Sequence, residues 1–362
     1  MRVINLVDRL DRVNYGIWNA AIATAAALRD AHGIESEIWF PAATRQAKDA
    51  ELNGARPRPL ERLDAAGLRE VSTAAGLDPA RDLVISHGCW QYPTRWGRAL
   101  KRRGHRWIGV PHGMLEAWSV SQKRLRKAVY FHLLEKPALK QADRVRAVGK
   151  PEFEKLQAVF GERTVWIPNG VPEVPEAQLR PEGGHFLFMA RLHHKKGVLP
   201  LVEGWNASSL RNREGFQLQI AGPDDGGFAD LKAFLDRHPD LRNVTYLGPV
   251  YGEEKARLLN RSHFYILPSF SEGFPTSVLE AMAAGLIPVI SRGCNFPDAL
   301  EAPIGIEVSP NPEAVREALE VAAGLDPAER TRRAEAARSL IRDHYTYATL
   351  AAEQAGLFRS LL

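Results

Sequence analysis

One stretch, residues 264–291, constrains the fold of this chain more than any other. It consists of an apolar run, a polar loop, a short helical pattern and a second apolar run. Pro275, followed by Thr276 and Ser277, is a helix-start signal, because proline presets φ and the two hydroxyls can cap free amides. Gly285 is placed to end this helix after about two to three turns. The stretch therefore predicts a strand, a helix and a second strand within a parallel α/β sheet.

The loop before this helix is a candidate anion site. In open α/β sheets, ligands collect outside the carboxyl ends of the strands, where a helix start offers unpaired amides and the positive end of a dipole. Glu272 lies in the loop, and Glu280 lies eight positions later, inside the helix. Two such acceptors suit a nucleotide sugar, with one carboxylate on the sugar and the other on the ribose. The structural alternative is that Glu272 favours the helix dipole and Glu280 is solvated.

The same stretch resembles a known family. Glu272 and Glu280 stand within Ser-Glu-Gly-Phe-Pro-x-x-x-Leu-Glu-Ala-Met-Ala-x-Gly, which is similar to the signature of retaining glycosyltransferases of family 4. The resemblance implies the GT-B fold, an α/β architecture in which two Rossmann-like, doubly wound domains face each other across a cleft. Four loop residues are then expected to bind the donor beside the two glutamates: Gly273, Phe274, Pro275 and Thr276.

Length and composition are those of a folded globular protein. The 362 residues suffice for two domains, and 45% are hydrophobic and 25% charged. No apolar stretch approaches the roughly 18 residues that a membrane-spanning helix needs. The chain start fits a first strand rather than a secretory signal. Cys89 and Cys294 lack metal-ligand spacing. Together these features predict a reduced, cytoplasmic protein.

Positive charge is concentrated in the first half of the chain. Residues 1–170 carry 28 Lys and Arg against 18 Asp and Glu, whereas residues 171–362 carry 20 against 25. The excess gathers in two clusters, 95–106 and 123–127. Four tryptophans are interleaved with them: Trp90, Trp96, Trp107 and Trp118. The clusters are either solvated helix faces or a surface for anionic lipid headgroups, where tryptophan is favoured. No nucleic-acid partner is expected, because no recognised binding motif accompanies the charge.

The first half alternates β-rich runs with helical patterns, which predicts a doubly wound parallel sheet. The expected strands are 3–7, 37–40, 83–86, 107–110, 144–148 and 164–167, and the expected helices are 20–28 and 125–136, the second closed by Pro137. After the first strand, Gly16 permits close approach of a phosphate or sugar to the backbone. The resemblance makes Gly16 a donor contact, although Tyr15 replaces the first glycine of the Gly-Gly pair that the family usually has.

Two histidines of this half follow predicted strands, His87 after 83–86 and His112 after 107–110. Each stands where a parallel sheet binds its ligand, although a lone histidine is more often structural than catalytic. By resemblance, His112 matches the strand-end histidine that faces the donor sugar and the reaction centre. Its Pro-His-Gly-Met-Leu setting is similar to a subgroup that builds bacterial exopolysaccharide and lipopolysaccharide. His87 matches less closely and is assigned to the acceptor or to shaping the cleft.

The domains are expected to meet near residue 170. Ile-Pro-Asn-Gly-Val and a stretch rich in Pro and Gly interrupt the pattern there, and the family usually enters its second domain with the same residues. The expected division is 1–170 as the acceptor-side domain and 171–345 as the nucleotide-sugar-binding domain. The resemblance implies that 346–362 forms a helix that returns to the N-terminal domain.

Two cations follow the first predicted strand of the second half, 185–190. Arg191 and Lys196 can neutralise a diphosphate, Arg191 through two parallel hydrogen bonds and Lys196 as a point charge. The alternative is a solvated basic loop. The segment resembles the family's Gly-Arg-Leu-x-x-x-Lys-Gly motif, with Ala190 in place of the first glycine. Val250, which follows a later strand, resembles a family residue that lies against the nucleotide base.

A glycosyl transfer requires a stabilised leaving group and a site that excludes water. Metal-dependent transferases hold the diphosphate through a cation on an Asp-x-Asp pair, and this sequence has no such pair. Arg191, Lys196 and the helix start would replace the cation, so neither a metal nor another cofactor is expected. The resemblance implies retention of configuration, with Glu272 on the sugar ring, Glu280 on the ribose and His112 hydrogen-bonded to the sugar. Glu272 as a covalent nucleophile is the less favoured alternative.

The sequence thus predicts a transferase that moves a sugar from a UDP- or GDP-sugar to a saccharide or lipid-linked saccharide in bacterial surface polysaccharide synthesis. The enzyme would be cytoplasmic, with peripheral binding to the inner membrane through its basic half. Two other classes stay open. One is a GT-B epimerase, phosphorylase or hydrolase, and the other is a non-catalytic module that binds a membrane or a partner.

Overall fold

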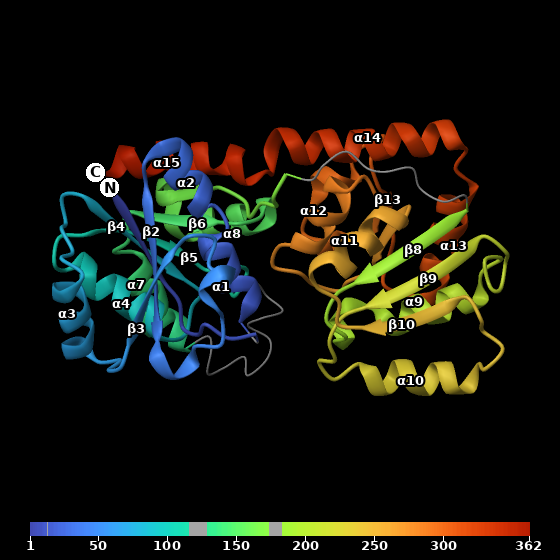
Figure 1. Cartoon of the computed structure of the whole chain (residues 1–362), viewed down its shortest axis with the longest axis horizontal. Helices are drawn as coiled ribbons and strands as arrows, with labels where there is room; N and C mark the ends of the chain where they lie inside the picture. Colours follow the sequence, from blue (N-terminus) through green and yellow to red (C-terminus); the bar gives the residue numbers. More distant parts are fainter. Residues whose placement is uncertain (13, 116–128, 174–182) are drawn as a thin grey trace. The chain divides into compact units, whose positions relative to one another are not determined.

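The structure is a computed structural model that describes residues 1–12, 14–115, 129–173 and 183–362. The chain forms two compact units: an N unit of Met1–Gly170 with Tyr345–Leu362, and a C unit of Val171–His344. Each unit contains one parallel sheet with helices packed against it (Figure 1).

The sheet of the N unit reverses its strand order at one point. Its strands are β1 (Arg2–Leu6), β2 (Glu35–Pro41), β3 (Arg56–Leu60), β4 (Asp82–His87), β5 (Arg106–Val110), β6 (Arg144–Ala147) and β7 (Thr164–Trp166). They lie in the order β3-β2-β1-β4-β5-β6-β7, all parallel. The chain winds outward in one direction from β1 and in the other from β4. The carboxyl ends of β1 and β4 therefore form the switch point at which doubly wound sheets bind ligands.

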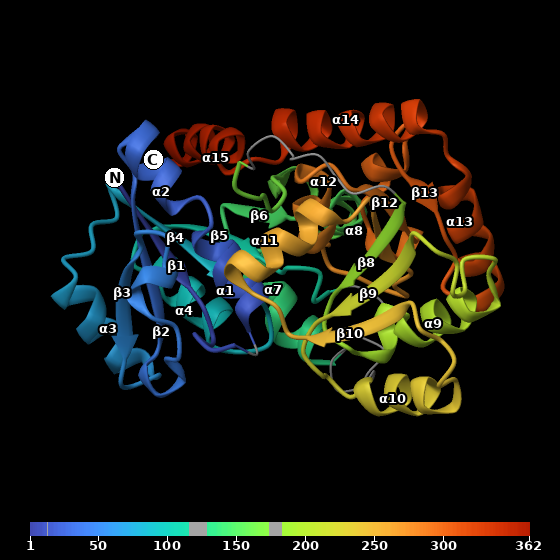
Figure 2. The same cartoon turned by 45° about the vertical axis from the view of Figure 1, so that its right-hand side comes forward.

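The helices of the N unit are α1 (Tyr15–Ile22), α2 (Ala25–His32), α3 (Ala65–Ala74), α4 (Tyr92–Lys101), a π-helical turn (Phe131–Glu135), α7 (Lys136–Leu139), α8 (Lys150–Phe160) and α15 (Tyr347–Leu361). The final helix α15 lies against α2 (Figures 1 and 2). The buried Thr24 hydroxyl donates to Gln354 Oε1 over 2.7 Å. This contact ties the end of the chain to its first helices.

Two predicted helix boundaries in this unit are wrong. The expected helix 20–28 is divided into α1 and α2 around Thr24, whose hydroxyl bonds to α15. Pro137 does not close a helix, because the π-helical turn Phe131–Glu135 continues directly into α7 and Pro137 lies in the first turn of α7. Residues 125–128 of the other expected helix lie outside the described part of the chain.

The expected tryptophan interface is also contradicted for two of its members. Trp107 and Trp96 are buried in the core of the N unit. The Trp107 indole donates to Ser86 Oγ over 2.9 Å and packs so closely on Gly97 that a Cβ there would lie 2.3 Å from Nε1. These rings hold α4 on the sheet and are not available to a membrane surface. Trp118 lies outside the described residues.

The C unit repeats the same winding. Its strands are β8 (Gly184–Met189), β9 (Phe216–Ala221), β10 (Val244–Gly248), β11 (Phe264–Leu267), β12 (Ile287–Ile290) and β13 (Ile306–Glu307). They are parallel and lie in the order β10-β9-β8-β11-β12-β13. The switch point falls between β8 and β11, where Phe186 pairs with Phe264 and their rings stack at 4.6 Å.

Helices cover both faces of this second sheet. They are α9 (Val198–Ala207), α10 (Phe228–Arg237), α11 (Gly252–Arg261), α12 (Thr276–Ala283), α13 (Pro312–Gly324) and α14 (Pro327–His344). Helix α9 packs against α10 and α13, whereas α12 packs against α14 (Figure 2). The strand order of both units confirms the predicted α/β class with two doubly wound domains. In the part of the chain that the structure describes, no helix is long and apolar enough to cross a membrane.

Candidate active site

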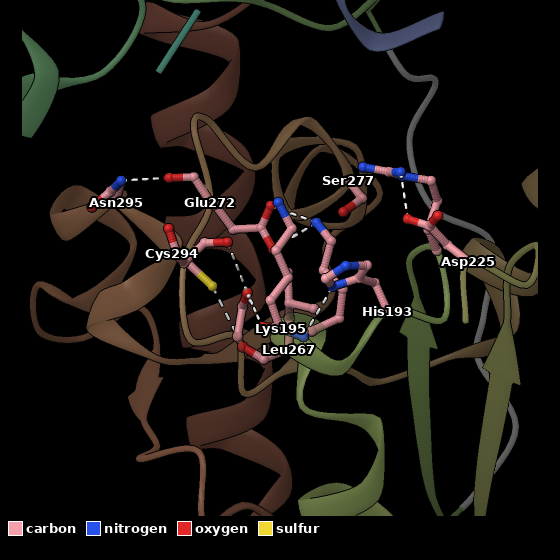
Figure 3. A network of polar contacts seen from close by, with 12 residues as sticks. His193, Lys195, Asp225, Leu267, Glu272, Ser277, Cys294 and Asn295 are labelled. Carbon is pink, nitrogen blue, oxygen red and sulfur yellow. Dashed lines mark hydrogen bonds and ion pairs between the residues drawn. The ribbon is translucent and has the colours of Figure 1, made fainter. Parts of the chain in front are cut away.

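Two loops meet at the switch point of the C unit because their strands are neighbours. One follows β8 and carries Arg191 and Lys196, and the other follows β11 and carries Glu272. The backbone amide of Phe270 donates to the carbonyl of Lys195 over 2.7 Å, and the Ser269 hydroxyl donates to the same oxygen over 2.9 Å. These bonds join the two loops through the backbone of Lys195, which Figure 3 shows within the network of polar contacts.

A glycine allows the close approach of the two loops. Gly197 has φ +73, and a Cβ at this position would lie 2.1 Å from the carbonyl oxygen of Pro268. Any side chain would therefore push the β8 loop away from β11 as well as strain the backbone. Lys196, the preceding residue, depends on this contact for its place.

Lys196 and Glu272 form a nearly buried ion pair. The Lys196 Nζ atom lies 2.7 Å from Oε1 and 2.5 Å from Oε2 of Glu272. The two side chains are only 12% and 8% exposed. Removing two charges from water is costly unless the pair is close and well oriented, and this pair is both. The arrangement fixes a cation and a carboxylate at the carboxyl edge of the sheet.

The backbone of Glu272 is anchored by the turn that follows β12. Its amide donates to the carbonyl of Gly293 over 2.7 Å, and the Asn295 side chain donates to its carbonyl over 2.5 Å. Asn295 adopts the left-handed conformation with φ +57, which asparagine tolerates better than most residues. The sequence indicated only a turn-rich segment here, and the role of Asn295 was not predicted. Figure 3 shows Asn295 beside Glu272.

Arg191 is paired with a carboxylate that the sequence did not single out. Its Nη1 atom lies 2.6 Å from Oδ2 of Asp225, and both side chains are exposed. Asp225 belongs to the loop after β9, which Gly222 brings against β8. A Cβ on Gly222 would lie 1.9 Å from the carbonyl oxygen of Ala190. Because the pair is exposed, Arg191 can exchange Asp225 for another anion at low cost.

Glu280 lies in α12 and pairs with Lys255 of α11 over 2.6 Å. The contact brings the start of α11 to the helix that follows Glu272. Val250 lies two residues before α11, and its side chain is buried. The side chain of Val250 is therefore not available to a ligand. Lys255 was not predicted, since no sequence pattern links residues 25 positions apart in different helices.

The predicted hydroxyl cap of α12 is wrong. The residue before the helix is Pro275, and no described side chain caps it. The Tyr265 hydroxyl donates to the carbonyl of Met189, so the Ser277 hydroxyl at 2.7 Å donates to Tyr265. Ser277 thus fastens α12 to the strands below it. The helix ends after Ala283, with Gly285 at φ +78, as predicted.

In the N unit, His87 and His112 form a direct contact. His87 ends β4, His112 follows β5, and His87 Nδ1 lies 3.0 Å from His112 Nε2. The other nitrogen of His87 lies 3.1 Å from Oδ1 of Asn5 in β1. His87 is 1% exposed and lies between its two partners. Its ring is therefore enclosed between Asn5 and His112.

Both imidazoles are held neutral. Burial, with a further contribution from the Arg146 guanidinium, lowers the pKa of His112 to about 3. Burial, His112 and Arg146 together lower the pKa of His87 well below its usual value. Arg146 is itself buried in β6 and donates to the carbonyls of Ile167 and Pro168. Neutral rings each carry one N–H and one lone pair.

The loop that holds His112 is shaped by a buried carboxylate. Glu152 accepts hydrogen bonds from the amides of Gly113 over 2.6 Å and Val148 over 2.8 Å. His112 has φ +55, an uncommon conformation for a residue with a Cβ. Gly16, the other predicted donor contact of this unit, lies exposed in the first turn of α1, where a Cβ would meet nothing within 4 Å.

Two members of the first basic cluster are paired with one carboxylate of the N unit. Lys101 Nζ lies 2.7 Å from both carboxylate oxygens of Asp143, and Arg106 lies 3.3 Å from one of them. Arg102 and Arg103 are exposed. The second cluster, 123–127, lies outside the described residues. Among the described residues, no group of three or more His, Cys, Asp or Glu is arranged to hold a metal ion.

Family models match both units. The model described as Glycosyl transferase 4-like domain matches residues 16–170, and the model described as Glycosyl transferases group 1 matches residues 173–340. The chain belongs to the family 4-type glycosyltransferases. This membership confirms the family that the motifs resembled.

Curated relatives of this glycosyltransferase are similar to it over part of its length. Glycogen synthase of Mycobacterium tuberculosis is 29% identical over 242 residues, which are 63% of this chain and 56% of the relative. GDP-mannose:cellobiosyl-diphosphopolyprenol alpha-mannosyltransferase of Xanthomonas campestris is 29% identical over 170 residues, which are 46% of this chain and 44% of the relative. The chain spans about half the length of the curated relatives it matches.

Solved structures with the same fold extend over the whole chain. HepE of Anabaena in complex with UDP and glucose has a TM-score of 0.78 at 16% identity and covers 100% of both chains. Sucrose-phosphate synthase from Thermosynechococcus elongatus has a TM-score of 0.76 at 17% identity and covers 100% of this chain and 99% of its own. At these identities the likeness shows the fold of this glycosyltransferase alone.

Proposed function

We propose that the chain transfers a sugar from a nucleotide-sugar donor to a saccharide or lipid-linked saccharide acceptor, with retention of configuration and without a metal. One observation carries the proposal. The nearly buried Lys196–Glu272 pair lies at the switch point of the C unit, and Arg191 lies in the same loop as Lys196. Ligands of doubly wound sheets bind at this position, and here it combines two cations with an oriented carboxylate.

The cations bind the diphosphate of the donor. Arg191 leaves the exposed Asp225 carboxylate and makes two parallel bonds to phosphate oxygens, because bidentate phosphate contacts are stronger than a single exposed pair. Lys196 donates through three hydrogens, so it can hold a phosphate oxygen while it stays bonded to Glu272. The uncapped start of α12 adds backbone amides. Together these groups supply the positive charge that a metal ion provides in metal-dependent transferases.

The carboxylates orient the rest of the donor. Each Glu272 oxygen lies within hydrogen-bond distance of Lys196, and each has a second lone pair that can accept a hydroxyl of the sugar ring. Glu280 is fixed by Lys255 through one oxygen, which leaves the other for the ribose hydroxyls. Val250 offers its backbone to the base, and Gly16, Gly273 and Phe274 contribute to the donor contact.

The transfer breaks the bond between the anomeric carbon and the diphosphate oxygen. The acceptor oxygen forms the new bond on the face from which the diphosphate leaves, and its proton passes to a phosphate oxygen. The neutral His112 hydrogen-bonds the sugar. Glu272 is a poor covalent nucleophile, since the Lys196 ammonium withdraws charge from both of its oxygens.

The names of the relatives support a lipid-linked acceptor. The Xanthomonas campestris relative is named for transfer from GDP-mannose to a saccharide on diphosphopolyprenol. A relative from Campylobacter jejuni, 36% identical over 110 residues, which are 30% of this chain and 27% of the relative, is named for transfer to a saccharide on diphospho-undecaprenol. By analogy, we place the reaction in bacterial surface polysaccharide synthesis.

A lipid-linked acceptor calls for contact with a membrane surface. Leu133 is 69% exposed and Leu134 is 51% exposed, on the π-helical turn, and the basic residues Lys136 and Lys140 follow in sequence. Exposed leucines beside positive charge favour the interface of an anionic bilayer. We propose peripheral binding of the N unit at this turn.

The test is acceptor-dependent release of the nucleotide in the presence of a metal chelator. Donor sugars are incubated with and without a lipid-linked saccharide extract, and the anomeric configuration of the product is assigned by NMR. Release that requires the acceptor, together with a retained linkage, supports the transferase. Release without an acceptor would instead identify a hydrolase or epimerase, and loss of activity with the chelator would overturn metal independence.

A further inference from the structure

Three polar side chains at the carboxyl edge of the N-unit sheet form a directed chain of hydrogen bonds. The chain begins at the carbonyl oxygen of Glu37 and continues through Asn5 and His87 to His112. Asn5 is 2% exposed, so its bonds have no competition from bulk water. The backbone carbonyl at the start of this chain determines which atom donates and which accepts in each of the three bonds.

A backbone carbonyl can only accept a hydrogen bond. The Asn5 atom 3.2 Å from Glu37 O is therefore its NH2 group, which turns the amide oxygen toward His87. That oxygen is also an acceptor, so His87 Nε2 must carry the hydrogen. A neutral ring has only one N–H, and His87 Nδ1 is thus a lone pair. It accepts from His112 Nε2 over 3.0 Å.

We infer that Asn5 and His87 are positioning residues that hold His112 as the tautomer with its hydrogen on Nε2. The Nδ1 atom of His112 is then a hydrogen-bond acceptor. Among the described residues, none is hydrogen-bonded to this nitrogen. The backbone of His112, at φ +55 and braced by Glu152 through Gly113, sets the place of the ring.

The fixed tautomer determines what His112 can recognise. A lone pair selects a group that donates a hydrogen, which in a sugar is a hydroxyl. Fluorine or a methoxy group at the same position has no hydrogen to give and is rejected. This specificity rests on the proposed function, because that function brings the sugar to His112. The tautomer itself does not depend on the donor.

The tautomer is measured on the free protein by two-dimensional long-range 1H–15N NMR with 15N-labelled histidine. We expect His112 to show an N–H signal at Nε2 and a lone-pair signal at Nδ1 between pH 6 and 8. An N–H at Nδ1 of His112 in the wild type would overturn the inference. The signals are assigned by comparison with His112→Gln and His87→Gln.

The variant Asn5→Leu tests the direction of the hydrogen bonds between Asn5, His87 and His112. Without the amide oxygen, an N–H on His87 Nε2 would be buried without a partner, so the hydrogen moves to Nδ1 and bonds to His112. Both rings are then expected to exchange tautomers, and the N–H signal of His112 moves to Nδ1. Ser72→Ala removes another buried hydrogen bond of the same unit, from Ser72 Oγ to Leu68 O, and should leave the His112 signals unchanged. An unchanged His112 tautomer in folded Asn5→Leu would show that Asn5 does not set it.

Donor analogues then test the consequence. Each sugar hydroxyl of the accepted donor is replaced in turn by fluorine, and kcat/KM is compared in the wild type and Asn5→Leu. One position is expected to lose at least tenfold in the wild type and to lose less in the variant. Equal losses in both proteins would overturn the specificity. If no nucleotide sugar binds, the proposed function fails, whereas the NMR result still decides the tautomer.

Discussion

The Lys196 ammonium lies 2.7 and 2.5 Å from the two carboxylate oxygens of Glu272, although 76 residues separate them in the chain. The contact exists because β8 and β11, which precede the two residues, are neighbours at the reversal of strand order. A doubly wound sheet thus brings a cation and an anion from distant motifs to one edge. The pair therefore gives testable predictions for the stability of the fold and for the proposed binding of the donor.

Removing one partner of this pair should lower the free energy of unfolding more than removing both partners. Lys196→Met leaves the Glu272 carboxylate, which is 8% exposed, without its cation, and we expect a loss of about 3–5 kcal/mol in the free energy of unfolding. The double variant Lys196→Met with Glu272→Leu should recover most of that loss but bind no donor. Denaturant unfolding and calorimetry measure the two effects. Full recovery of donor binding in the double variant would contradict the role of the pair.

Gly197 should not tolerate a side chain. Gly197→Ala adds a Cβ 2.1 Å from Pro268 O at a residue with φ +73, so we expect about 1 kcal/mol of backbone strain and about 1–3 kcal/mol for the clash. Gly33→Ala is the matched control, because Gly33 has φ +66 and nothing within 4 Å of a Cβ. It should show the backbone strain alone. Equal losses of unfolding free energy in both variants would rule out the clash.

The histidine pair predicts a loss of stability in acid. The pKa of His112 is lowered to about 3 in the folded chain, whereas an unfolded histidine has a pKa near 6.5, so the unfolded chain binds the proton first. Stability therefore falls as the pH falls below about 6.5, by about 2 kcal/mol from His112 between pH 7 and pH 5. Urea unfolding across this range tests the slope. His112→Gln should flatten it, and an unchanged slope would show that the pKa of His112 is not lowered in the folded chain.

The exposed leucines should matter for membrane binding. Leu133→Ser with Leu134→Ser removes apolar surface that is exposed on the π-helical turn, and we expect at least a fivefold weaker affinity for vesicles that contain anionic lipid. Val321→Ser is the control, since Val321 of the C unit is 56% exposed and lies far along the chain from the basic clusters. Vesicle sedimentation measures both. Equal binding by the wild type and the leucine variant would exclude this turn as the contact.

Local patterns predicted the parallel sheets well, because apolar runs and helix signals act over a few residues. Strand β3 (Arg56–Leu60) was missed, since Pro57 and Pro59 argue against a strand. These prolines are tolerated because β3 is an edge strand of its sheet. Alternate backbone N–H groups of an edge strand face no neighbouring strand, so a proline there removes no hydrogen bond of the sheet. The division of the first helix was missed because its cause, Gln354, lies at the other end of the chain.

The motifs named Lys196 and Glu272, which are in contact at the edge of the C-unit sheet, but they did not predict what anchors the candidate residues. Arg191, Lys196, Glu272 and Glu280 were named from local signals, whereas their partners were not. Asp225, Lys255 and Asn295 come from other loops and helices, and only the winding of the sheet brings them close. Asn5 was missed for the same reason, because nothing local marks an asparagine in the middle of a strand as the partner of His87.

The central claim is that the switch point of the C unit binds the diphosphate and ribose of a nucleotide sugar. We would measure it by calorimetry without divalent metal, with UDP, GDP and ADP sugars. The proteins are the wild type, Arg191→Ala, Glu280→Ala and the control Lys232→Ala, whose exposed pair with Asp236 lies on α10. The account predicts binding of one nucleotide by the wild type and the control, weakened at least tenfold in the other two. Binding that is unchanged by Arg191→Ala and Glu280→Ala, or absent in the wild type, would contradict it.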